Sequence, residues 1–103
     1  MPANIGEVKL SIVSVNNGIN QINNSAQSVQ AAIAEVNKHF NALSPDRYSS
    51  PAADKLRSEY SMQTKRLQAV YENLMVFKTN LEASRDRIVQ AAQENGMDLS
   101  SVV

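Results

Sequence analysis

Apolar residues in the first half of the chain recur at alternating spacings of three and four positions. This spacing places them on one face of an α-helix, in the a and d pattern of a coiled coil. It predicts a long helix over about residues 5–43. The positions are Ile5, Val8, Ile12, Val15, Ile19, Ile22, Ala26, Val29, Ile33, Val36, Phe40 and Leu43.

A similar series follows in the second half of the chain, with polar residues at two of its positions. It predicts a second helix over about residues 51–95, ended by Gly96, which readily adopts the left-handed conformation of a helix C-cap. The series is Leu56, Tyr60, Gln63, Leu67, Val70, Leu74, Phe77, Leu81, Ser84, Ile88 and Ala91.

Two prolines mark the break between the helical segments. Pro45 disfavours helix at the residue before it, and Pro51 suits the first turn of a new helix that Ser50 caps. A loop at 44–50 is short enough to fold the two helices back on each other. We therefore expect an all-α fold, with two long antiparallel helices forming a single helical-hairpin domain over 1–103 and a flexible tail at 96–103.

The seam between the helices is expected to use the large apolar members of both series. From the first helix these are Ile12, Ile19, Ile33 and Phe40, and from the second they are Leu67, Leu74, Phe77 and Leu81.

Charge and composition narrow the classes of partner. Ten basic and ten acidic residues give a net charge of zero, which provides no field to attract nucleic acid. The apolar runs are too short for membrane insertion, and no apolar stretch of a signal peptide follows the N-terminus. The expected location is the cytoplasm. Cysteine is absent, which excludes disulfides and thiolate metal sites.

Residues that could carry catalysis are scattered along the chain. His39 is the only histidine and has no second histidine or cysteine with which to share a metal. No phosphate-binding loop or nucleophile motif occurs. We therefore expect no catalytic, cofactor-binding or metal-binding residues and interpret the chain as an interaction module rather than an enzyme.

The second helix carries further apolar residues outside its predicted seam. At helical spacing, a row with seven-residue repeats lies well away from the seam. Such residues are compatible with ordinary helix filler. They are also compatible with a surface that binds a partner in a hetero-oligomer or a homodimer, for which methionines are well suited. The row is Met62, Ala69, Val76 and Ala83, with Tyr71, Met75 and Val89 nearby.

A helical hairpin of this length, with an aromatic residue in the loop before the second helix, resembles the Trp-x-Gly (WXG) superfamily of type VII secretion. Tyr48 and Ser50 stand where that family has Trp-x-Gly. The opening sequence of residues 6–12 is most similar to the small α-helical proteins associated with LXG toxins of Gram-positive bacteria. The family's export signal, an aromatic residue followed four positions later by an acid, is not matched by Tyr71 or Phe77.

This resemblance implies a targeting factor or chaperone that binds the helical N-terminal domain of a toxin, together with a second small helical protein. It also implies export by a type VII route that needs no signal peptide. Two alternatives remain open. Residues 56–60 resemble the start of the second helix of a type III secretion needle subunit, and a generic self-associating coiled-coil adaptor has the same heptad pattern.

Overall fold

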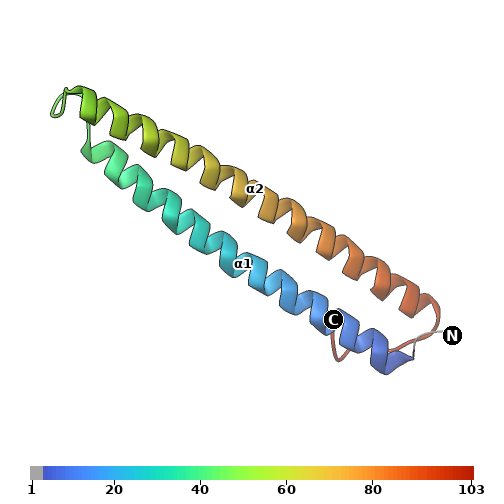
Figure 1. Ribbon diagram of the computed structural model, residues 1–103. Helices are drawn as coiled ribbons and strands as arrows, with labels where there is room; N and C mark the ends of the chain where they lie inside the picture. Colours follow the sequence, from blue (N-terminus) through green and yellow to red (C-terminus); the bar gives the residue numbers. More distant parts are fainter. Residues whose placement is uncertain (1–3) are drawn as a thin grey trace. The chain divides into compact units, whose positions relative to one another are not determined.

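The computed structural model describes residues 4–103 and contains two helices, α1 (Ile5–Ala42) and α2 (Pro51–Glu94). Both begin where the heptad pattern predicts and end within one residue of the predicted position. Within the described residues there is no β-strand. The predicted all-α fold of two antiparallel helices in a hairpin is confirmed (Figure 1).

Local hydrogen bonds explain where the helices begin. The backbone N–H of Glu7 donates to Oδ1 of Asn4 over 2.8 Å, so Asn4 caps α1. In the same way the N–H of Ala53 donates to Oγ of Ser50 over 3.1 Å, which confirms Ser50 as the cap of α2. These side chains satisfy N–H groups that have no partner within the first turn of a helix.

The end of α2 is a Schellman turn. Gly96 has φ of +78°, its N–H donates to the carbonyl of Gln93, and the N–H of Met97 donates to the carbonyl of Ala92, each over 3.0 Å. This pair of bonds satisfies carbonyls that the helix leaves free, and it needs a residue without a Cβ at the left-handed position. The predicted role of Gly96 is confirmed.

The chain packs as two compact units, and each contains part of α1 and part of α2. One, called here the end unit, comprises 4–24 and 75–103 within the described chain, and the other, called the turn unit, comprises 25–74. In the end unit, Ile19 and Ile22 of α1 are 7% and 8% exposed. Gly18 faces α2 there, and a Cβ added to it would lie 3.7 Å from Cδ1 of Leu81.

The C-terminal segment 97–103, called here the strap, belongs to the core of the end unit. Leu99 is 2% exposed and clusters with Ile12 and Ala92, which are 0% and 5% exposed. In Figure 1 this segment turns back from the end of α2 and runs beside the first turns of α1. The placement differs from the expected flexible tail because Leu99 finds an apolar surface on which to pack.

In the turn unit, the buried residues are small. Ala26 is 4% and Ala53 is 7% exposed, while larger seam residues such as Ile33, Leu67 and Leu74 are half-buried. The rings of His39 and Tyr60 stack with centroids 6.1 Å apart. This contact joins the two helices at the surface and gives His39 a packing role.

The seam of α2 differs from the predicted one at every second position. Phe77 is 55% and Val70 is 46% exposed, and on α1 the predicted seam residue Phe40 is 37% exposed. The half-buried or buried row is instead Tyr60, Thr64, Leu67, Tyr71, Leu74, Lys78, Leu81, Arg85, Ile88 and Ala92.

The predicted and the observed row have five residues in common, which repeat every seven positions: Tyr60, Leu67, Leu74, Leu81 and Ile88. A residue three or four positions further on can complete a helical seam, so apolar spacing does not decide between the rows. Polar pairing favours the observed one. Arg85 donates to Asn16 over 3.1 Å, and Thr64 lies 3.4 Å from the side-chain oxygen of Asn37.

Candidate interaction surface

The residues predicted to bind a partner divide into exposed and half-buried groups. Met62 and Val76 are 49% and 60% exposed, and Ala69 is exposed as well. Tyr71, Met75 and Ala83 are half-buried, with Tyr71 in the row that completes the seam. Val89 packs against the cluster of Ile12, Ala92 and Leu99 and is half-buried there.

In the end unit, the most exposed apolar part of α2 is the pair Val76 and Phe77. They are 60% and 55% exposed. A shallow pocket of about 240 Å³ beside Val76 is also lined by Met75, Thr79 and Asn80. Large apolar side chains that form a contiguous exposed patch mark a surface that another protein covers.

In the turn unit, Met62 lies in a polar setting. A pocket of about 250 Å³ places it beside Glu59, Gln63 and Arg66. A second pocket, of about 210 Å³, contains Phe40 with four polar residues of both helices. These hollows combine single apolar side chains with charged or amide groups, which is the composition of an interface rim.

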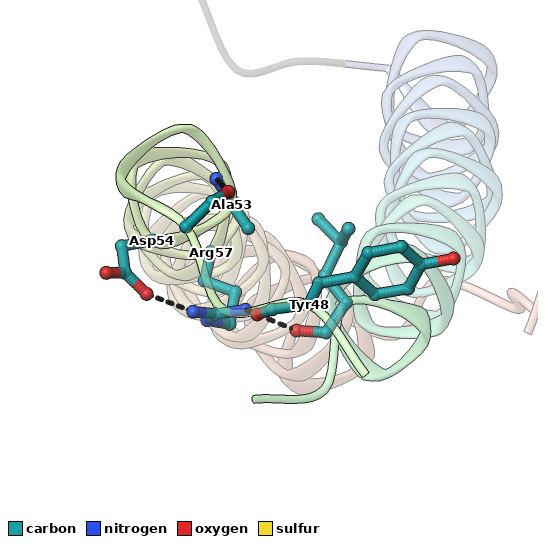
Figure 2. A network of polar contacts seen from close by, with 6 residues as sticks. Tyr48, Ala53, Asp54 and Arg57 are labelled. Carbon is teal, nitrogen blue, oxygen red and sulfur yellow. Dashed lines mark hydrogen bonds and ion pairs between the residues drawn. The ribbon is translucent and has the colours of Figure 1, made fainter. Parts of the chain in front are cut away.

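The loop between the helices is organised by Arg57 (Figure 2). Its Nη1 donates to the carbonyls of Leu43 and Tyr48 over 2.7 and 2.8 Å, and its Nη2 pairs with Asp54. The Arg57 side chain is only 14% exposed. Because one planar guanidinium holds both sides of the loop, the backbone at Tyr48 is fixed while the residue remains 51% exposed.

The charged groups of the surface are weakly coupled. His39 and Glu35 lie 3.5 Å apart on α1, and Arg85 and Asp86 lie 3.2 Å apart on α2. The second pair, in which Arg85 is 28% and Asp86 is 69% exposed, contributes about 0–1 kcal/mol. Hydrogen bonds from the backbone and side chain of Ser100 lower the pKa of Asp98 below its ordinary value of 3.8.

Arg57 and Leu99 are the two structurally important residues that the sequence pattern did not indicate. Arg57 lies three positions after Asp54, a spacing that suggests only an ion pair within the helix. Its reach to Leu43 depends on the path of the loop. Leu99 follows a helix end in a short segment of mixed polar and apolar residues, which is too short for its spacing to predict which of them is buried.

Neither a family model, nor a curated protein sequence, nor a solved structure matches this chain. Across residues 4–103, no helix has the length and apolar character needed to cross a membrane. Within the same residues, no three histidine, cysteine or acidic side chains gather in a way that could hold a metal ion.

Proposed function

We propose that this protein is a non-enzymatic interaction module that binds the helical N-terminal region of a type VII secretion effector of the LXG class and assists its targeting or export. The observation that carries the proposal is the exposed pair Val76 and Phe77 on α2 of the end unit. A partner helix that covers both side chains would remove large apolar surface from water, which is the main favourable term in association.

Two further observations support a helical partner. The chain is itself a helical hairpin, and helices pack readily against such hairpins through heptad-spaced apolar residues. Because its net charge is zero, no long-range electrostatic repulsion opposes the approach of a charged partner. The resemblance of the hairpin and of the loop residues Tyr48 and Ser50 to the WXG superfamily supports the choice of effector class.

Co-expression with the helical N-terminal region of an LXG toxin tests this function. Size-exclusion chromatography with light scattering is expected to show a stable heteromer. Val76→Glu should prevent its formation and leave the circular dichroism of the protein helical. Gln21→Glu is the matched control, because it introduces the same charge at an exposed position of α1.

Other results would reject the proposal. A heteromer that forms equally well with Val76→Glu would exclude this surface. Filaments of the pure protein, without binding of the toxin region, would favour a type III needle-like subunit. A closed homo-oligomer that does not bind the toxin region would favour a self-associating coiled-coil adaptor.

A further inference from the structure

The strap presents two aliphatic side chains to the body of the end unit on a single helical turn. The N–H groups of Val102 and Val103 donate to the carbonyl of Leu99 over 3.0 and 3.1 Å. Leu99 and Val102 are thus three positions apart on one turn, and both pack on the same cluster. The surface beneath them, called here the strap site, consists of Val8, Ile12, Ile88, Val89 and Ala92.

Residues 98–103 of the strap contact this surface chiefly through the packing of Leu99 and Val102, to which Lys9 of α1 adds an electrostatic attraction for the carboxylate of Asp98. Within the described chain, the hydrogen bonds of residues 98–103 join strap residues to one another, as in the bond from the Ser100 N–H to Asp98. The last backbone bond to α2 is that of Met97, at the Schellman turn. Residues 98–103 can therefore leave the strap site without breaking any of the hydrogen bonds described for α1 and α2.

The strap also fills less than the whole concave surface beside it. A pocket of about 310 Å³ adjoins Val102 and Val103 and is otherwise lined by Asn16, Arg85, Asp86 and Val89. Val89 belongs both to the strap site and to this pocket. An occupant longer than one helical turn would keep the contacts of the strap and extend into the pocket.

We infer that the strap site is a docking site for an amphipathic helix, and that the chain's own strap fills it when no partner is bound. The strap itself indicates the occupant: a helical turn with leucine and valine three positions apart. A partner helix with that spacing competes for Val8, Ile12 and Ile88. Its apparent affinity is lowered by the fraction of molecules whose strap is closed.

This inference rests on the proposed function in one respect, namely that the natural partner is helical. It adds a second binding surface, separate from Val76 and Phe77, and a competing segment within the same chain. Its test uses a synthetic helix, so its outcome is independent of any toxin. If the toxin region does not bind but the synthetic peptide still competes with the strap, only the proposed function is rejected.

The probe is a fluorescein-labelled, alanine-rich helical peptide of about four turns, in which leucine and valine repeat at the spacing of Leu99 and Val102. Fluorescence anisotropy compares the full-length protein with its Leu99→Asp and Ser101→Asp variants. Leu99→Asp should expel the strap and tighten binding roughly tenfold, equivalent to about 1.4 kcal/mol. Ser101→Asp carries the same charge at an exposed strap position and should bind like the unmodified protein.

A second measurement does not depend on the folding of Leu99→Asp. The chain has no cysteine, so Ser101→Cys accepts a single spin label on the strap. Saturating peptide should convert the label from restricted to fast motion, whereas a peptide with serine in place of leucine and valine should not. A label that stays restricted, equal affinities for all variants, or no peptide binding would overturn the inference.

Discussion

Leu99 packs against Ile12, and the two side chains shield each other almost completely from water. They are 2% and 0% exposed, although 87 positions of the sequence separate them (99 − 12). Ile12 belongs to the heptad-spaced apolar row of α1. Its burial is completed by a residue outside both helices, so the end unit has a core built from three segments of chain.

The first prediction concerns the glycine within α1. Gly18→Ala should raise the free energy of unfolding by about 1 kcal/mol, because alanine favours the helix by that amount. The new Cβ would make an ordinary contact, 3.7 Å from Leu81. Thermal unfolding followed by circular dichroism measures the change. A lower melting temperature would show that Leu81 cannot accommodate the methyl group.

The second prediction concerns Arg57. Arg57→Ala should lower the free energy of unfolding by about 1–3 kcal/mol, because the carbonyls of Leu43 and Tyr48 lose a charged donor. Arg57→Lys should recover only part of the lost free energy of unfolding, since an ammonium lacks the planar set of donors of a guanidinium. Arg66→Ala is the exposed control. Urea unfolding compares the variants, and equal effects of alanine at both positions would contradict the role of Arg57.

The third prediction separates the observed seam from the predicted one. Leu74→Asp should abolish cooperative folding, because it places a charge in the half-buried row of α2. Phe77→Asp should leave the helices intact, because Phe77 is 55% exposed. Circular dichroism and thermal unfolding report both effects. Equal loss of structure in the two variants would support the row that contains Phe77.

The fourth prediction concerns Asp98. Its pKa is lowered in the folded chain, so its carboxylate stabilises the strap turn above the ordinary value of 3.8. This contribution should disappear as the pH falls through the lower folded value. The amide chemical shift of Ser100, followed by NMR between pH 6 and about pH 2, should report the transition. Asp98→Asn keeps an acceptor oxygen but should remove the pH dependence.

The sequence predicts the helices and their caps well because those features depend on local chemistry. The spacing of α1 from Val8 to Val36 predicts its buried face, and Ser50 and Gly96 occupy the capping positions that their residue types favour. For α2, two rows satisfy the same heptad spacing. The choice between Phe77 and Lys78 depends on pairing across the hairpin, as in the bond from Arg85 to Asn16.

The contacts of Arg57 and Leu99 were beyond prediction for a related reason. Each joins parts of the chain whose relative path is not encoded by local periodicity, namely the loop at Leu43 for Arg57 and the first turns of α1 for Leu99. Among the residues predicted for partner binding, Met62, Ala69 and Val76 are exposed, whereas Val89 lies under the strap. Whether the exposed residues bind a partner stays a prediction.

The internal hydrogen bonding of the strap has a thermal consequence. Apolar burial of Leu99 and Val102 holds the strap on the end unit, and the hydrogen bonds of residues 98–103 lie within the strap itself. Apolar association weakens on cooling because its driving force near room temperature is entropic. The strap should therefore detach more readily in the cold than at ambient temperature, while the hydrogen-bonded helices beneath it keep their structure.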